Sequence, residues 1–540
     1  MKRGADLFAK ALQDACVTQL FSVSGNHLMT LYDALLSTDI RIIHCRHEAA
    51  CVHMADAWGR LTGKPGVACV TAAQGHTNAA AALYTALAAE SPVVLLSGHC
   101  PLGEIGRGSF QEMDQVGYAR PVTKASWMSN DVMTMGFDLD RAIALASAGR
   151  PGPVHLSLPA DLLEQDIPAD LEQKSPRFAA SPAVEPDQSL IGQLASHIRG
   201  AEAPLVICGP AFCTPAGRRL MHDASEKLNI AVIGMESPRG VNDPGLGAFA
   251  DILSRADLLV LVGKPLDFTL RFGGAPIAGT AKWVVIDPDP ALVARAQGLL
   301  GDRLDFTAVA DAKPTLDALI KLGPLARNSD WLQSVTELLA YRPAQWLQTP
   351  SSTGERLHPA EMCAPIADFV QKHPGATFIT DGGEISQWAQ AMVKTDRRVI
   401  NGVAGAIGPA IPSAIAAKLH SPDDPVIVAM GDGTFGFHMA EFDTALRYNL
   451  PFITVVGNDA RWNAEYQIQL REFGKDRAKH CELLPTRYDL VVEGLGGFGT
   501  LVTDAKELPH VIEEAHQSGK PACINVMIEG VAAPVIRRER

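Results

Sequence analysis

One stretch near the C-terminus, residues 426–459, constrains the fold of this 540-residue chain most strongly. Two apolar runs of strand length, Val426–Met430 and Phe452–Val456, flank a part with helical composition, Ala440–Tyr448. A strand, a turn, a helix and a second strand in this order predict two parallel strands joined by a helix. Open parallel sheets bind ligands outside the carboxyl ends of their strands, so we expect a binding site there.

The residues that follow these two strands suit a metal ion and a diphosphate. Gly431 and Gly433 allow backbone NH groups to approach an anion closely. Asp432 and Asp459 offer the oxygen ligands that Mg²⁺ takes at about 2.0–2.1 Å. A lone Gly-Asp-Gly sequence is usually an ordinary tight turn. The helix-containing spacer and the closing Asn-Asp pair favour a magnesium-bridged diphosphate instead.

Apolar runs of strand length alternate with helical segments along the whole chain, and this alternation predicts parallel sheets covered by helices. Polar, proline-containing stretches at residues 166–188 and 342–358 divide the runs into three sets. We therefore expect three doubly wound α/β domains, at residues 1–165, 190–335 and 355–540. The predicted strands are Leu20–Val23, Arg41–Cys45, Gly66–Val70, Val93–Ser97, Val154–Leu158, Leu205–Cys208, Leu258–Val262, Trp283–Ile286, Thr377–Thr380, Val426–Met430, Phe452–Val456 and Ala522–Val526.

The composition excludes several kinds of partner. A net charge of -13 with no basic stripe argues against a nucleic acid, and no apolar stretch reaches the roughly 18 residues of a membrane span. The N-terminal sequence MKRGADLFAKALQDA indicates an amphipathic helix rather than a signal peptide. The 10 cysteines form no CxxC pair and suit reduced thiols. We therefore expect a cytoplasmic protein.

The first predicted domain carries a second group of candidate residues around Glu48, which follows a strand and opens a helix. A Glu in the first turn of a helix most often only compensates the helix dipole. Three nearby segments favour a functional role: SVSGNH, which ends at His27; TAAQGHTNA, at residues 71–79; and GSFQEMDQ, which contains Gln111. Each follows a predicted strand, where parallel sheets carry functional loops.

The order of these motifs resembles that of the thiamine diphosphate enzymes, in the branch of acetolactate synthases, benzaldehyde lyase and 2-hydroxyacyl-CoA lyases. The resemblance covers nearly the whole chain. It implies a pyrimidine-binding, a middle and a diphosphate-binding domain in this order, with thiamine diphosphate and Mg²⁺ as cofactors. It also implies a homodimer or homotetramer, because the cofactor bridges two subunits. The motifs are RHEAA, TGKPGVACVTAAQGHTNA, FQEMDQ, GRPGPVHLSLPADL, NGVAGAIGPAIPSAIAA and the segment at 426–459.

The resemblance assigns roles to individual residues. Glu48 would hydrogen-bond the aminopyrimidine ring of the cofactor and promote loss of the thiazolium proton. Asp432, Asp459 and the backbone carbonyl of Arg461 would hold Mg²⁺. Ile407 would be the apolar wedge that props the cofactor into its bent shape. The remaining cofactor contacts implied are Gly405, Ala406, Gly431, Gly433 and Thr434.

The residues expected beside the substrate follow partly from the family and partly from departures from it. His27 falls where benzaldehyde lyase has a histidine facing the reacting carbon, and it is either an acid-base group or a structural histidine. Gln111 matches a glutamine beside the substrate oxygen. The segment NDARWNAEYQIQLREFG lacks the Gly-Met and Trp of acetolactate synthases. We expect Trp462, Glu465 and Tyr466 of this segment to contact a different substrate.

Two further departures concern the cofactors. Asp459 stands where the family carries Asn, which keeps an oxygen ligand but adds a negative charge next to Asp432. The middle domain lacks the GMLGMHG-like stretch that accompanies flavin in acetolactate synthases. We therefore expect no FAD.

Together these features predict an enzyme that makes or breaks a carbon-carbon bond next to a carbonyl group. It would act through an enamine, an acyl-anion equivalent, on 2-keto acids or 2-hydroxy carbonyl compounds. A 2-hydroxyacyl-CoA lyase or a 2-keto acid decarboxylase would use the same enamine and is an alternative. A catalytically silent cofactor-binding or regulatory subunit is another, although such a chain has no need for Glu48. The arginines of the C-terminal VAAPVIRRER could close over an anionic ligand or be solvated.

Overall fold

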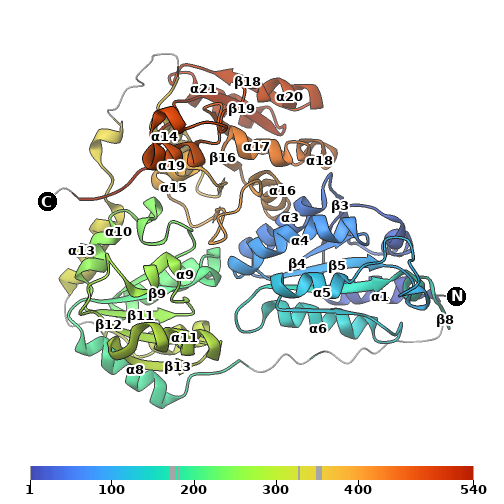
Figure 1. The fold of residues 1–540 in the computed structure, drawn as a ribbon, viewed down its shortest axis with the longest axis horizontal. Coiled ribbons are helices and arrows are strands. Elements are labelled where there is room, and N and C mark those ends of the chain that lie inside the picture. The colour runs from blue at the N-terminus through green and yellow to red at the C-terminus, as the bar shows by residue number, and fades with distance from the viewer. Residues whose placement is uncertain (1, 169–177, 179–182, 326–328, 348–355, 539–540) are drawn as a thin grey trace. The chain divides into compact units, whose positions relative to one another are not determined.

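Three parallel sheets follow one another along the chain, so the predicted α/β class with three sheet domains is confirmed (Figure 1). The computed structural model describes residues 2–168, 178, 183–325, 329–347 and 356–538. No helix among these residues is both long and apolar enough to cross a membrane.

The first sheet carries helices on both faces because its strands alternate their buried side chains between the two sides. Helices α3 (Glu48–Thr62) and α4 (Gln74–Ala88) contact strands β4 and β5, and α1 (Gly4–Asp14) packs with α2 (Met29–Leu35) and α6 (Met135–Ser147). In spatial order the strands are β3 (Arg41–His44), β2 (Gln19–Ser22), β4 (Gly66–Val70), β5 (Val93–His99), β7 (Pro153–Pro159) and β6 (Ala125–Met128). The short elements are α5 (Gln115–Ala119), α7 (Ala160–Glu164) and the antiparallel pair β1 (Lys2–Arg3) and β8 (Asp166–Ile167).

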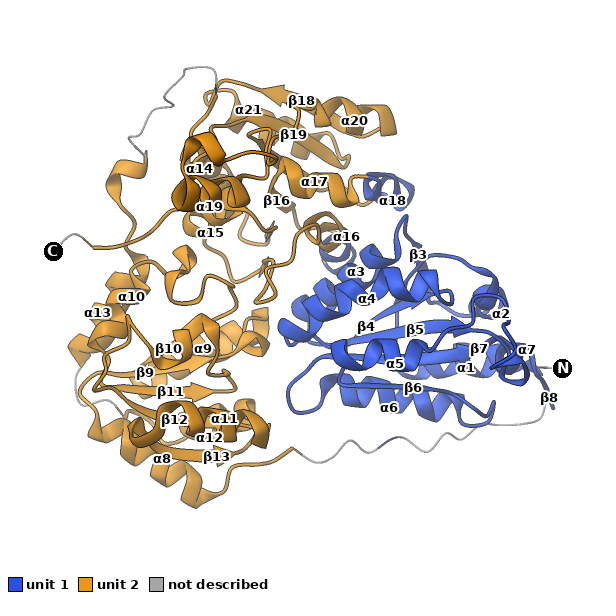
Figure 2. Cartoon of the chain, in the orientation of Figure 1, with its two compact units in different colours: residues 1–182, 415–420, 440–449 blue, residues 183–414, 421–439, 450–540 orange. Residues whose placement is uncertain are grey.

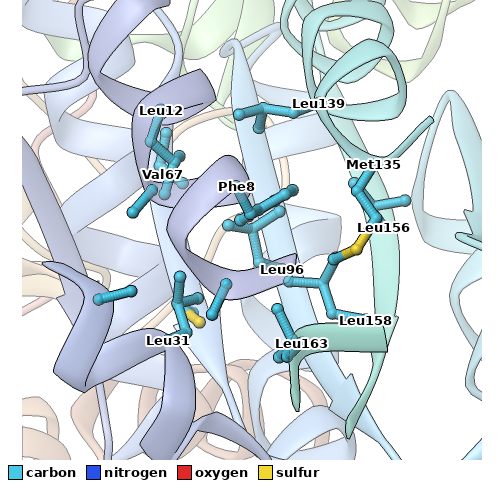
Figure 3. Packing of buried hydrophobic residues seen from close by; sticks show 14 of the residues in the cluster. Phe8, Leu12, Leu31, Val67, Leu96, Met135, Leu139, Leu156, Leu158 and Leu163 are labelled. Atoms are coloured by element: carbon cyan, nitrogen blue, oxygen red, sulfur yellow. The ribbon is translucent and has the colours of Figure 1, made fainter. Parts of the chain in front are cut away.

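Helix α1 is the amphipathic helix predicted at the N-terminus, and its apolar face fills the core on one side of this sheet (Figure 3). Phe8 and Leu12 project from α1 among side chains of β5 and β7, including Leu96 and Leu156. All four are fully buried. The charged residues on the other face of α1 therefore interrupt the apolar sequence without interrupting the core.

The second sheet is built in the same way. Its strands, in spatial order, are β10 (Ala231–Gly234), β9 (Pro204–Cys208), β11 (Leu258–Val262), β12 (Lys282–Asp287) and β13 (Leu304–Val309). Its helices are α8 (Gln188–Gly200), α9 (Pro215–Leu228), α10 (Phe249–Arg255), α11 (Pro290–Leu300), α12 (Ala312–Ile320) and α13 (Ser329–Ala340).

The third sheet contains the segment that dominates the sequence. Its strands, in spatial order, are β15 (Arg398–Val399), β14 (Thr377–Thr380), β16 (Val426–Gly431), β17 (Ile453–Asn458), β19 (Ala522–Met527) and β18 (Phe498–Val502). The helices along this part of the chain are α14 (Pro359–Lys372), α15 (Glu384–Met392), α16 (Ala410–His420), α17 (Asp432–His438), α18 (Glu441–Arg447), α19 (Asn463–Phe473), α20 (Tyr488–Leu495) and α21 (Leu508–Gln517).

Every predicted strand is present, and the structure adds strands that the sequence did not indicate. Five of the added strands, β6, β10, β13, β15 and β18, each lie at an edge of a parallel sheet. An edge strand is covered on fewer sides than a central one, so its sequence needs no continuous apolar run. Most residues of β6, β13 and β18 are only partly buried, in agreement with this reason.

The chain forms two compact units (Figure 2). Unit 1 contains the first sheet together with residues 415–420 and 440–449, and unit 2 contains the second and third sheets. Helix α18, although it lies between β16 and β17 in sequence, therefore belongs to unit 1.

The domain boundaries at 1–165, 190–335 and 355–540 stay a prediction. Both predicted linkers extend outside the described residues, the first at 169–177 and 179–182 and the second at 348–355.

Candidate functional site

Two buried aspartates lie at the carboxyl ends of neighbouring strands in the third sheet. Strands β16 and β17 pair in parallel with Gly431 opposite Gly457, so Asp432 and Asp459 follow the two strands at the same edge. Burial raises the pKa of Asp432 to about 6. Burial and then the charge of Asp432 raise the pKa of Asp459 to about 7. Two close carboxyl groups of this kind form an unfavourable pair unless a proton or a cation lies between them.

The carboxyl groups keep a position open for a ligand. The Oδ2 atom of Asp432 is buried and has no hydrogen-bond partner among the described residues. After Asp459 the chain makes a left-handed turn at Ala460 and forms an antiparallel bridge between Arg461 and Glu482. The backbone hydrogen bonds at this turn are made by the carbonyl of Ala460 and the amide of Trp462. The carbonyl of Arg461 takes no part in these bonds. The set of oxygens fits a hard divalent cation.

Gly433 and Thr434 lie in the first turn of α17, which begins at Asp432. A Cβ atom on Gly433 would lie 2.8 Å from the ring of Trp462, so only glycine fits under this ring. The ring of Trp462 also meets Phe437 edge to face, with 6.2 Å between the centroids. The Thr434 hydroxyl donates to the Gly431 carbonyl at 3.0 Å and thereby stabilises the start of the helix.

The loop at residues 405–408 is fixed by an aspartate that sequence reasoning missed. Asp381 directly follows β14, and its carboxylate accepts hydrogen bonds from the NH groups of Gly382 at 2.7 Å, Gly408 at 2.8 Å and Ala410 at 3.1 Å. Burial raises the pKa of Asp381 to about 6. Asp381, like Asp432, comes directly after the end of a strand, and this position in the sequence could have indicated it.

The predicted wedge residue Ile407 is partly open to solvent. Its side chain is 40% exposed in the single chain, and its Cγ2 atom would lie 2.7 Å from a Cβ atom on Gly382. The carbonyl oxygen of Ala406 would be 3.0 Å from the same Cβ atom, while Gly405 adopts a φ of 67°. The loop therefore presents an exposed apolar side chain beside the strand end that Asp381 occupies.

The three residues predicted to contact the substrate lie at the start of α19. Trp462 precedes the helix, Glu465 is exposed, and Tyr466 lies under the guanidinium group of Arg461, 4.5 Å from its ring centroid. The Asn463 side chain donates to the carbonyl of Val531 at 2.8 Å. This bond ties α19 to the segment that leads into the C-terminal tail.

The C-terminal tail is attached to the second-sheet region of unit 2. Ile536 is buried in the core of that region, and the amide of Arg538 donates to Asp251 at 3.3 Å. Arg540 lies outside the described residues. The predicted role of the tail arginines stays a prediction.

In unit 1, Glu48 is the first residue of α3 and follows β3, as predicted. Its side chain is half-buried, and the Asn78 amide of α4 donates to its Oε2 atom at 3.0 Å. The preceding residue, His47, caps the helix by accepting from the Ala49 amide at 3.0 Å. A Cβ atom on Gly75 would lie only 2.9 Å from Thr71 Cγ2 and in ordinary contact, at 3.7 Å, with Glu48 Oε1, so Gly75 packs closely beside Thr71 and near the carboxyl group.

His27 and Gln111 lie near the same strand ends. The Nδ1 atom of His27 is 3.1 Å from the Thr71 hydroxyl, and its ring stacks on Phe110 with 6.1 Å between the centroids. Burial lowers the pKa of His27, which keeps the imidazole neutral near pH 7. The Gln111 amide donates to Gln74, the first residue of α4, at 3.0 Å.

The loop that carries Phe110 and Gln111 is shaped by Glu112. Its carboxylate accepts from the NH groups of Gly106 at 2.5 Å and of Gly108 and Ser109 at 3.0 Å each. These bonds lower the pKa of Glu112. The loop borders a cavity of about 530 Å³.

Each unit thus supplies one kind of chemistry. The third sheet offers a pair of buried carboxyl groups with raised pKa values beside an exposed apolar loop, and the first sheet offers a half-buried carboxyl group with a neutral histidine. These features define an α/β protein whose candidate functional residues lie at the carboxyl ends of its parallel strands, where such sheets bind ligands.

Comparison with known proteins identifies the family. Residues 2–118 match the thiamine pyrophosphate enzyme N-terminal TPP binding domain, and residues 381–526 match the thiamine pyrophosphate enzyme C-terminal TPP binding domain. The acetolactate synthase large subunit IlvG of Mycobacterium tuberculosis is 31% identical, over 98% of this chain and 96% of the relative. The chain therefore belongs to the thiamine pyrophosphate enzymes, and the predicted family and thiamine diphosphate-dependent enzyme class are confirmed.

Relatives with other activities also align over nearly the full length. The 2-hydroxyacyl-CoA lyase 2 of Homo sapiens is 27% identical, over 98% of this chain and 90% of the relative. The oxalyl-CoA decarboxylase of Escherichia coli K12 is 26% identical, over 98% of this chain and 96% of the relative. The chain is thus similar to synthases, lyases and decarboxylases alike.

The two aspartates of the third sheet predict a pH dependence of stability. Between about pH 4 and pH 7 the folded chain holds a proton on Asp459 that the unfolded chain has released, because the folded pKa is about 7 and the ordinary value is 3.8. The metal-free protein should therefore lose stability as the pH rises through this window.

The Asp459→Asn variant should lose less stability over the same pH range, because residue 459 no longer titrates while Asp432 and the other groups still do. Free energies of unfolding from denaturant titrations with a chelator, at about pH 5 and about pH 8, would measure both losses. An equal loss in the two proteins would contradict the assignment.

Proposed function

We propose that this chain is a Mg²⁺- and thiamine diphosphate-dependent carbon-carbon lyase or carboligase, resembling acetolactate synthases, that acts on a small carbonyl compound. The observation that carries the cation site is the buried pair Asp432 and Asp459, with an Asp432 oxygen that has no hydrogen-bond partner in the described part of the chain. When bound, thiamine diphosphate supplies a carbon nucleophile for the carbonyl group of a substrate.

The residues of the third sheet would hold the diphosphate end of the cofactor. Asp432, Asp459 and the Arg461 carbonyl would bind Mg²⁺, which agrees with the open oxygen position on Asp432. The NH groups at the start of α17 would bind the diphosphate, since helix N-termini attract anions. Further contacts would come from Gly405, Ala406, Ile407, Gly431, Gly433 and Thr434.

The residues of the first sheet would handle protons and the substrate. Glu48 would share a proton with the aminopyrimidine ring, and Asn78 orients its carboxyl group at 3.0 Å. His27 is buried and neutral, which suits a group that accepts and returns a proton. Gln111, Trp462, Glu465 and Tyr466 would contact the substrate.

We further propose a homodimer or homotetramer in the cytoplasm. All 10 cysteines belong to the described residues and are free thiols, as expected in a reducing compartment. In the family resemblance, the cofactor needs the first domain of one subunit and the last domain of another, so a single chain would not suffice.

A 2-hydroxyacyl-CoA lyase or a 2-keto acid decarboxylase is the second candidate. It is supported by the similarity to the human lyase and the bacterial decarboxylase over nearly the whole chain. Both alternatives use the same cofactor and would need the same Glu48, so only the products distinguish them.

The reaction is tested by mass spectrometry of products from 2-keto acids, 2-hydroxy ketones and 2-hydroxyacyl-CoA thioesters. We expect carbon-carbon cleavage or ligation products that depend on added cofactor and Mg²⁺. Release of carbon dioxide without ligation would favour the decarboxylase, and coenzyme A products would favour the acyl-CoA lyase. A purified protein without turnover and without cofactor binding would overturn the proposal.

Glu48→Gln should lower turnover by about 10²-fold or more, because the amide cannot exchange a proton with the cofactor. The fold should be retained, since Glu48 is only half-buried and Gln preserves the bond to Asn78. Steady-state kinetics and circular dichroism would measure both effects, with the exposed Glu164→Gln as a matched control. Near-normal turnover in Glu48→Gln would refute the assigned role.

Asp459→Asn should keep thiamine diphosphate binding but raise the Mg²⁺ concentration needed for half-maximal binding. The substitution removes a charged ligand while retaining a neutral oxygen, and ligand charge sets much of the cation affinity. Cofactor binding titrated against Mg²⁺ by fluorescence would show the shift, with the exposed Asp504→Asn as the control. Superimposable titrations would show that Asp459 does not bind the cation.

A further inference from the structure

A buried carboxylate outside the predicted site holds the turn that leads to Glu48. Glu441, the first residue of α18, is fully buried and belongs to unit 1 (Figure 2). Its Oε1 atom accepts from the amide of Arg46 at 3.0 Å and from the amide of His47 at 3.1 Å. These are the two residues directly before Glu48.

The other contacts of α18 bind the strand that precedes this turn. The Tyr448 hydroxyl accepts from the His44 amide at 2.8 Å and donates to the Ile42 carbonyl at 2.9 Å. The Arg447 guanidinium donates to the His44 carbonyl at 2.7 Å. One end of α18 thus holds the turn before α3, and the other end holds the last residues of β3.

The bonds to Glu441 satisfy a specific need of this turn. The amides of Arg46 and His47 lie between β3 and α3, where neither the sheet nor the helix provides an acceptor. A single carboxylate oxygen accepts from both, and such charge-assisted bonds are stronger than neutral ones. The other oxygen, Oε2, accepts from the Thr444 hydroxyl at 2.6 Å, so both oxygens of Glu441 are fixed.

We propose that Glu441 is a positioning residue for Glu48: it fixes the backbone of the turn from which the Glu48 side chain reaches the cofactor. The inference rests on the proposed role of Glu48 and extends it to a residue in the last quarter of the sequence. Asn78 orients the carboxyl group of Glu48, and Glu441 orients the backbone that carries it. Two independent supports are consistent with a group whose position must be accurate, since displacement by about 1 Å can cost about 10²-fold in rate.

The test compares Glu441→Ala with Glu441→Gln in the holoenzyme. The amide oxygen of Gln can accept from both backbone NH groups, and its NH₂ group can donate to the Thr444 hydroxyl. The measurements are the rate of hydrogen-deuterium exchange at the thiazolium carbon, at saturating cofactor, and the Kd of thiamine diphosphate. The control is Asp257→Ala, because Asp257 also accepts from two consecutive amides, those of Glu202 and Ala203, at 2.8 and 2.9 Å.

We expect Glu441→Ala to slow the exchange by about 10- to 100-fold with little change in the cofactor Kd. Glu441→Gln and Asp257→Ala should exchange close to the wild-type rate. A purely structural role would not separate exchange from cofactor binding in this way. Normal exchange in Glu441→Ala, or equal slowing in the Ala and Gln variants, would overturn the inference.

The outcome for Glu48→Gln separates this inference from the proposed function. If Glu48→Gln keeps the normal rate of exchange at the thiazolium carbon, the proposed function fails. If Glu48→Gln slows the exchange but Glu441→Ala does not, only the inference about Glu441 fails. If Glu441→Ala does not fold, Tyr448→Phe is the milder substitution to test in its place. It removes only the hydroxyl that bonds to the backbone of His44 and Ile42. Slower exchange in Tyr448→Phe would then support the inference, and unchanged exchange would overturn it.

Discussion

The parallel pairing of β16 with β17 is the constraint on which the candidate cation site depends. It places Gly431 opposite Gly457 and so brings two aspartates to one edge of the sheet. Their burial is unfavourable for two negative charges, and the pKa values of both are raised as a result. A bound divalent cation would offset this repulsion, so the same contact that costs the metal-free protein stability would provide the affinity for the ion.

Buried or partly buried carboxylates recur as the means of fixing loops that follow the strands. Asp381 accepts from three amides around the loop at 405–408, and Glu112 accepts from three amides of the loop that carries Gln111. Glu441 does the same for the turn before Glu48. Loops of this kind lack the regular partners of helices and sheets, and a carboxylate satisfies several amides at once. The loops thereby gain defined positions without additional secondary structure.

The fold was predictable from the sequence wherever a strand is buried on both faces of the sheet and has a neighbouring strand on each side. Such strands, for example β11 and β16, are continuous apolar runs that the sequence shows directly. The strands that prediction missed at sheet edges have mixed sequences, because half of their surroundings is solvent or polar. The candidate site was predictable in part for a similar reason. Asp432 and Asp459 each follow a strand directly and Glu48 follows one after a short turn, so their place at the edge of a sheet depends only on local sequence.

The sequence by itself determined the order of the strands that are apolar runs, the motifs at their ends and, through these motifs, the family. Only the tertiary structure decided which residues support them. Glu441 and Arg46 are far apart in the chain, and no local pattern indicates that α18 leaves its neighbours in sequence to pack in unit 1. The reason is physical: periodicity and turn chemistry act over a few residues, whereas the partner of a buried amide is set by how distant segments pack.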